Sequence, residues 1–318
     1  MKPASRLALV ALLWSAGCSA HSAGAASSAA DSLFTGLLVI AACSYAIGWL
    51  RLSTRGAKGT PSAMHRVLFA LAIGSLVLAF HGPLDEMAES SFAAHMAQHL
   101  LLMLVAPLLL VLARPGPVWL WALSRTARHA LARATAPWAS RARRVLLHPP
   151  LVYAYTSLTF WFWHLPGPYD AALAQPWLHA LEHAMLFATS AAFWSLVLPA
   201  AGRHRHAFGS MILYVATFGM QNGLLGALLT FARRPIYAAY SVNGPFGLTP
   251  LQDQQLAGLL MWVPASAFHL CTITVLFTQW MRFLDQRATR TVASRPPVSL
   301  NGRENAVMRR VRRASGPT

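Results

Sequence analysis

Residues 93 to 113 read AAHMAQHLLLMLVAPLLLVLA, and this stretch decides the fold. It carries no Asp, Glu, Lys or Arg, and as a helix rising about 1.5 Å per residue it is long enough to cross about 30 Å of hydrocarbon. Its two histidines, His95 and His99, are four residues apart and therefore share one face of that helix. The stretch predicts a membrane-spanning helix that begins with a polar pair.

The rest of the chain repeats this apolar pattern. The composition is 56% hydrophobic and only 11% charged, as is typical of an integral membrane protein. We predict an all-α fold, a polytopic transmembrane bundle of about seven helices, with no second folded domain. The predicted spans lie near residues 33 to 50, 64 to 81, 93 to 113, 150 to 165, 179 to 199, 208 to 231 and 253 to 281.

The N-terminal segment differs from these spans. Lys2 and Arg6 precede an apolar run that is too short to cross a bilayer, which is typical of a secretory signal. The run ends at Cys18 in a sequence that resembles a lipoprotein cleavage box, and we expect cleavage between Cys18 and Ala26. The alternative is an uncleaved N-terminal helix. The predicted organisation is a targeting segment at 1 to 26, a membrane domain at 27 to 285 and a basic, disordered cytoplasmic tail at 286 to 318.

Charge predicts the orientation of the bundle. Of the 26 Lys and Arg residues, 22 fall in four segments: 51 to 66, 114 to 148, 203 to 205 and the tail from Arg282. Short basic loops stay on the cytoplasmic side, so the mature N-terminus is predicted outside and the C-terminus inside. The net charge of +17 then reflects topology and attraction to the anionic lipid bilayer, and we expect no nucleic-acid partner.

Histidines gather at the predicted outer ends of four spans. A second pair with the same spacing, His179 and His183, opens another span, while His81 and His164 close spans that should lie beside the pairs. Ionisable side chains at membrane depth are costly and usually functional. The sequence therefore predicts a metal site at the outer face, with these ligands: His81, His95, His99, His164, His179 and His183.

The ligand types indicate which metal such a site would choose. Imidazole suits copper and zinc, and nearby thioethers favour Cu(I) over zinc, so we expect copper as Cu(I), with zinc as the alternative. Side chains close in sequence are candidates for an outer shell around the ligands: Asp85, Asp170, Glu182, Asp253, Met96 and Met103.

Each outer-shell candidate also has a simpler interpretation. The methionines would serve as core packing, Glu182 as a helix-interface residue, and Asp253 as a helix-start residue. The aromatics of the longest outer loop, among them Tyr237 and Tyr240, are interpreted as an interfacial belt in preference to a lid over the site.

Other chemistries lack their motifs. Cys18, Cys43 and Cys271 form no closely spaced pair, which argues against thiol-based chemistry. The sequence shows no Gly-rich phosphate loop and no nucleophile elbow. Energy-driven pumping by this chain alone is therefore not expected.

Three stretches carry a family resemblance: HMAQHLLLMLVAP at 95 to 107, WHLPGPYD at 163 to 170 followed by HALEH at 179 to 183, and LTPLQDQQLAGLLMWVP at 248 to 264. Together they resemble the bacterial cytochrome c oxidase assembly factors of the CtaG type, over about residues 36 to 281. The resemblance implies a multi-pass protein of the bacterial inner (plasma) membrane that is needed to make an active haem-copper oxidase and helps to supply its copper. The matching positions are His81, His95, His99, His164, His179, His183 and Asp253.

Residues and resemblance lead to one functional expectation. The outer histidines would receive copper, from a periplasmic donor, and hold it for transfer to cytochrome c oxidase subunits, without enzymatic turnover. Three alternatives remain: a metal-free assembly scaffold, a membrane-embedded zinc hydrolase with Asp170, Glu182 or Asp253 as base, and a haem-binding redox carrier. The last suits the pairs least, because haem ligands must face each other across the ring.

Overall fold

The computed structural model describes residues 27–56, 60–200, 208–240 and 247–293, together with residues 307 and 310. Every regular element in these ranges is helical, which confirms the predicted all-α class. The predicted targeting segment, with Cys18 and the expected cleavage region, lies outside the described residues. The elements in chain order are α2 (Ser27–Thr54), α3 (Ala63–Phe80), α4 (Pro83–Ala88), α5 (Phe92–Leu100), η1 (Leu101–Val105), α6 (Ala106–Ala113), α7 (Gly116–Ala122), α8 (Arg125–Leu146), α9 (Pro149–Trp163), α10 (Pro166–Ala174), α11 (Pro176–Ala200), α12 (Phe208–Thr230), η2 (Ala238–Tyr240) and α13 (Pro250–Ala293).

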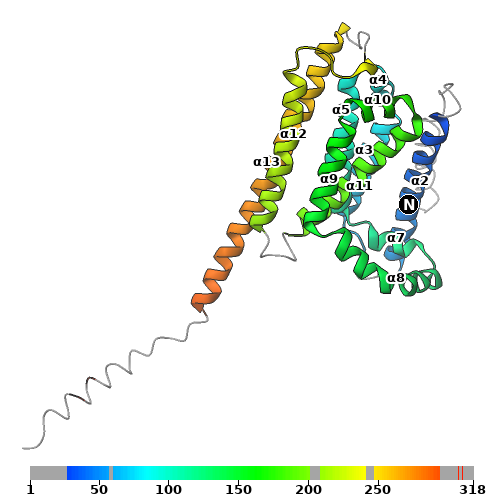
Figure 1. The fold of residues 1–318 in the computed structure, drawn as a ribbon. Helices are drawn as coiled ribbons and strands as arrows, with labels where there is room; N and C mark the ends of the chain where they lie inside the picture. The colour runs from blue at the N-terminus through cyan, green and yellow to red at the C-terminus, as the bar shows by residue number, and fades with distance from the viewer. Residues whose placement is uncertain are drawn as a thin grey trace, which may run out of the picture.

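Six helices in the described residues are long and apolar enough to cross a membrane, where the sequence predicted about seven. They are Ser32–Thr54, Ala63–Phe80, Phe92–Ala113, Pro176–Leu198, Phe208–Thr230 and Pro250–Arg290. The segment predicted at 150 to 165 is also a helix, α9, but its 15 residues extend only about 22 Å, so it is shorter than these six. It joins α8 to α10, which lie at opposite ends of the bundle (Figure 1).

Two polar segments are more ordered than predicted. The stretch 114 to 148, expected as a loop, contains α7 and α8, because its many Ala and Arg residues favour helix and its apolar residues fall on one side of α8. The expected tail from residue 286 begins as helix, since α13 continues to Ala293.

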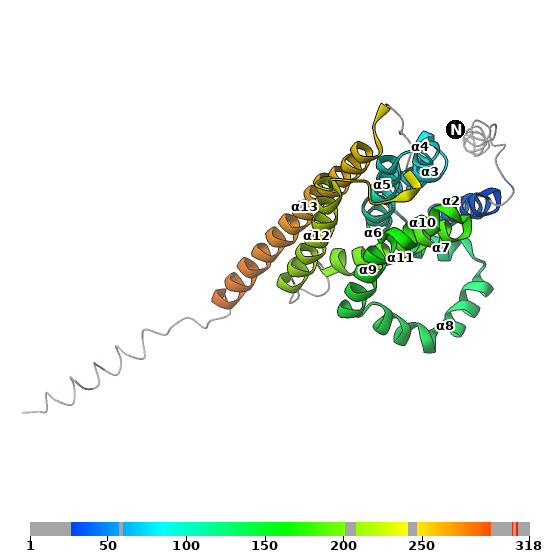
Figure 2. The same ribbon diagram turned by 45° about the horizontal axis from the view of Figure 1, so that its top comes forward.

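The helices are arranged as a bundle with two different ends. Figure 1 shows α4 and α10 at one end, and α7 and α8 at the other. The antiparallel helices α12 and α13 form a long hairpin, and α13 packs along α5. Figure 2 shows α8 on the outside of the bundle, between the ends of α7 and α9. Side chains at the α4 end are therefore separated from the basic helix α8 by the length of the bundle.

The α12–α13 hairpin is held by close backbone contact. A Cβ atom added at Gly258 would lie 2.6 Å from the carbonyl oxygen of Gly226 and 2.5 Å from the Thr230 hydroxyl. Small residues at this crossing allow the two backbones to approach closely, which is how helices gain packing energy in lipid.

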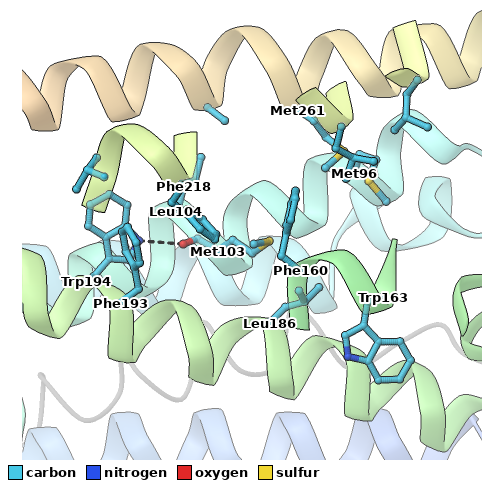
Figure 3. Packing of buried hydrophobic residues seen from close by; sticks show 14 of the residues in the cluster. Met96, Met103, Leu104, Phe160, Trp163, Leu186, Phe193, Trp194, Phe218 and Met261 are labelled. Carbon is cyan, nitrogen blue, oxygen red and sulfur yellow. Dashed lines mark hydrogen bonds between the residues drawn. The ribbon is translucent and has the colours of Figure 1, made fainter. Parts of the chain in front are cut away.

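A π-helical turn, η1, interrupts the span that carries His95 and His99. Pro107 has no N–H, so the carbonyl of Met103, four residues earlier, loses its usual helical donor. The indole Nε1 of Trp194 donates to that carbonyl at 3.0 Å instead, from α11 (Figure 3). This hydrogen bond fixes α11 against the span formed by α5, η1 and α6. It thereby holds together the two helices, α5 and α11, that carry the histidine pairs.

Candidate metal centre

Helix α5 presents the first histidine pair. His95 and His99 are 0% and 2% exposed, and their Nε2 atoms lie 2.9 Å apart. The start of α5 is held from the far end of the sequence, because Asp253 accepts hydrogen bonds from the Ser91 hydroxyl at 2.8 Å and from the Phe92 amide at 2.6 Å. A carboxylate at a helix N-terminus satisfies free amides and complements the helix dipole. Asp253 therefore positions the pair without belonging to it.

Helix α11 presents the second pair directly opposite the first. The ring centroid of His95 lies 5.1 Å from that of His179 and 5.7 Å from that of His183. The ring of His99 lies 5.3 Å from that of His183. Because both pairs have the i, i+4 spacing and both helices begin at the same end of the bundle, two parallel helical faces bring four imidazoles into one space.

His164, the residue that caps α9, adds a fifth imidazole. Its ring lies 5.6 Å from that of His99, and its Nδ1 lies 2.7 Å from the carbonyl oxygen of Phe160. A carbonyl only accepts, so Nδ1 carries the proton and Nε2 keeps its lone pair. Such a tautomer is ready to bind a metal through Nε2. We call His95, His99, His164, His179 and His183 the histidine cluster.

Glu182 joins this cluster from α11. Its carboxylate oxygen lies 3.6 Å from the Nε2 of His99, and its side chain is fully buried. The sequence predicted an outer-shell or interface position for Glu182, but the carboxylate lies among the candidate ligand atoms. When ionised, this carboxylate can compensate the charge of a bound cation.

Two sets of three ligand atoms can each hold one ion. In both sets all atoms lie within 4.8 Å of one another. We call His95, His179 and His183 the outer group, and His95, His99 and Glu182 the inner group. Metal–imidazole bonds of about 2.0 Å place ligand atoms up to about 4 Å apart, so small rotamer changes suffice to close either group on an ion.

Several buried ligand atoms have no hydrogen-bond partner among the residues that the structure describes. They are His99 Nδ1, His164 Nε2, His179 Nε2, His183 Nε2 and both carboxylate oxygens of Glu182. Buried polar atoms are nearly always paired, because an unpaired one costs about 1–3 kcal/mol. Five side chains with this property around one space fit a bound metal ion.

Tyr240, from η2, orients His95. Its hydroxyl donates to the carbonyl oxygen of Ala88 at 2.9 Å and lies 3.1 Å from the Nδ1 of His95. The tyrosine hydroxyl has one proton, which it donates to the Ala88 carbonyl. The Nδ1–H of His95 therefore donates to the tyrosine oxygen, and the Nε2 of His95 keeps its lone pair. Burial raises the pKa of Tyr240, so the phenol stays neutral.

The other loop aromatics also belong to the site wall. Tyr237 is buried and donates to the carbonyl oxygen of His164 at 2.8 Å. Tyr169, from α10, is buried and donates to Tyr240 at 3.4 Å. The preferred interpretation of Tyr237 and Tyr240 as an interfacial belt is therefore wrong, since both cover the cluster.

The remaining predicted residues lie around the cluster or away from it. His81 is exposed and pairs with the Thr35 hydroxyl, outside both groups. Asp85 accepts from the Gln98 amide at 2.8 Å, and Asp170 accepts from the Ala239 amide at 3.3 Å. Both acids thus hold the backbone and side chains that surround the site.

Met96 and Met103 lie in the hydrophobic core. Figure 3 shows Met96 beside Met261, and Met103 among aromatic and leucine side chains. The two groups consist of histidine and glutamate atoms, and both methionine side chains are buried in the core.

Two comparisons place the chain among known proteins. A family model described as "Cytochrome c oxidase caa3 assembly factor" matches residues 43–283. Two curated relatives, Uncharacterized protein Mb0105 of Mycobacterium bovis and Uncharacterized protein MT0111 of Mycobacterium tuberculosis, are each 27% identical over 284 residues. The alignment covers 83% of this chain and 40% of each relative, so the chain spans less than half the length of the curated relatives it matches. No solved structure matches.

Proposed function

The chain belongs to the family of cytochrome c oxidase caa3 assembly factors, and we propose that it binds copper at the histidine cluster and helps to deliver this copper to the oxidase. The observation that carries the proposal is the set of five side chains whose buried ligand atoms lack partners within the described residues. Imidazole is a good ligand for copper, and four or five imidazoles allow stepwise exchange with a partner's ligands.

The charge of the cluster fits a small cation. Neutral imidazoles add no charge, and ionised Glu182 adds one negative charge, which a Cu(I) ion would balance. His164 and His95 are held in the tautomer that offers Nε2, by Phe160 and Tyr240 respectively. The protein thus orients ligands in advance and encloses the ion with Tyr169, Tyr237 and Tyr240.

The location and partners follow from the same proposal. We propose that the cluster end faces the periplasm of a bacterial inner membrane, because the basic residues of α8 lie at the opposite end. A periplasmic donor would then supply the copper, and the receiving partner would be an oxidase subunit. The chain acts as a carrier and not as an enzyme in this proposal.

The test is the metal content of the detergent-purified protein after loading with Cu(I) under reducing conditions. We expect near-stoichiometric copper in the wild type and its loss in the quadruple variant His95→Ala/His99→Ala/His179→Ala/His183→Ala. The matched control is His65→Ala/His129→Ala/His148→Ala, which removes histidines that lie outside both groups.

The outcomes separate the alternatives. A folded wild type that takes up no copper would overturn the proposal and leave the scaffold function. Stable zinc in place of copper would favour the hydrolase, because three protein ligands with an open position suit zinc catalysis and the inner group includes a carboxylate.

A further inference from the structure

A cavity of about 690 Å³ opens beside the histidine cluster. It lies between α4, α10, η2 and the first turn of α11, with Phe34 and Phe80 stacked at 4.6 Å on one side. Two cluster residues line it, His179 and His183. His99, His164 and Glu182 do not line it, so the cavity reaches the cluster from one side only.

Two of the unpaired cluster nitrogens belong to residues that line this cavity, His179 and His183. His183 is 3% exposed, and neither its Nε2 nor that of His179 has a partner among the described residues. Tyr240, which contacts His95, also lines the cavity. A ligand atom that is buried, unpaired and next to open space is where an arriving ion would first bind.

The cavity wall is acidic. It includes the carboxylates of Asp85, Glu89 and Asp170, and none of the described residues that line it is Lys or Arg. The chain as a whole has a net charge of +17, so this wall carries the opposite sign. Carboxylates around a recess with low-dielectric walls concentrate cations locally and raise their association rate by about 10-fold or more.

The two ligand groups share His95. The outer group also uses the two histidines that line the cavity, whereas the inner group uses His99 and the buried Glu182. An ion bound to the outer group can therefore move inward by exchanging His179 and His183 for His99 and Glu182 while His95 stays bound. The carboxylate adds a charge that holds the ion more tightly at the inner position.

We propose that this cavity is the access route for the metal cation, which binds first to the outer group and then passes to the inner group through the shared ligand His95. The inference rests on the proposed function, because it concerns the same cluster. It adds a direction of loading, separate roles for the two groups, and a role for three carboxylates in attracting the cation.

The test measures loading and release rates separately from final copper content. Cu(I) is supplied to the full chain in detergent as its cationic acetonitrile complex, and unbound Cu(I) is captured by a chelator at increasing times. We expect Glu89→Gln/Asp170→Asn to load about 10-fold more slowly than the wild type at low salt, with the same final content. The control Glu86→Gln removes an exposed carboxylate that does not line the cavity and should load at the wild-type rate.

The two groups are distinguished by a second pair of variants. His179→Ala/His183→Ala should slow loading at least 10-fold, whereas His99→Ala/Glu182→Gln should load normally and release copper to the chelator at least 10-fold faster. Full copper content with wild-type loading rates in the carboxylate and outer-group variants would overturn this inference alone. A wild type that binds no copper would overturn it together with the proposed function.

Discussion

The two ends of the bundle both carry histidines, but within the part of the chain that the structure describes only one end brings them together as a candidate site. At the α4 end, four buried imidazoles and the half-buried His179 converge from α5, α9 and α11. At the α8 end, His129 and His148 are exposed among arginines. The comparison shows that convergence of several helices, and not residue type, separates a candidate ligand from a solvated side chain.

The same contrast holds for charge. The cluster end has a cavity lined by three carboxylates, whereas α8 contributes Arg128, Arg141 and Arg144 at the other end. Arg128 lies over the ring of Trp121 at 4.0 Å, an amphipathic pairing typical of a membrane surface. One end is suited to attract a cation and the other to contact anionic headgroups.

The largest effect on stability should come from Asp253. Replacing it with Ala leaves the Ser91 hydroxyl and the amides of Phe92 and Ala93 without their buried acceptor. We expect Asp253→Ala to lower the free energy of unfolding by about 3 kcal/mol, as for loss of one partner in a buried charged contact. Thermal unfolding in detergent measures this loss, and copper retention should fall with it because α5 carries the first pair.

Two further variants sharpen this prediction. Asp253→Asn keeps one oxygen acceptor and should lose about half as much stability. Asp285→Ala removes an exposed carboxylate from the same helix and should change stability by less than about 0.5 kcal/mol. Equal effects of Asp253→Ala and Asp285→Ala on stability would show that α5 does not depend on the Asp253 carboxylate at its N-terminus.

The next largest effect should come from Tyr240→Phe, which removes the hydroxyl that orients His95. Loss of such a supporting contact typically weakens metal binding 10- to 100-fold, and we expect about 10-fold weaker copper affinity by chelator competition. Tyr155→Phe removes a hydroxyl that bonds Leu146 near the α8 end and should leave the affinity unchanged. Unchanged affinity in both variants would show that His95 needs no support.

Much of the fold and of the cluster followed from the sequence. Long apolar runs specify spans because a bilayer leaves few alternatives to helices. The i, i+4 spacing of His95/His99 and His179/His183 specifies shared helical faces, and the structure does bring the two pairs together. Predictions based on the helical period and on the length of apolar runs therefore succeeded.

The parts that failed depend on tertiary contacts. Nothing local shows that Glu182 reaches His99, that the Trp194 indole replaces the donor missing at Pro107, or that Tyr240 lies over His95. The helix predicted at 150 to 165 is present as α9, but it has only 15 residues, because Pro166 starts a new helix just after it ends. The sequence did contain one signal for the tyrosine cover of the site, namely the pair of tyrosines in a loop next to the predicted cluster.

A smaller effect is expected from Trp194→Phe, which tests the link between α11 and the π-helical turn. The variant keeps an aromatic ring but removes the donor to the buried carbonyl of Met103, so unfolding should be easier by about 1 kcal/mol. In a Pro107→Ala background the backbone N–H can serve Met103, so the cost of Trp194→Phe should fall. An equal cost in both backgrounds would contradict this explanation of the turn.

The smallest effect is expected from His81→Ala, although His81 lies at the cluster end and was among the predicted ligands. Its side chain is exposed and lies outside both ligand groups, whereas His179 belongs to the outer group. We expect His81→Ala to keep full copper content and to change stability by less than about 0.5 kcal/mol, while His179→Ala slows loading. Metal analysis and loading rates of the two single variants compare two histidines at one end of the bundle. A loss of copper in His81→Ala would contradict this expectation. It would show that position at that end of the bundle, and not convergence in the buried cluster, defines the ligands.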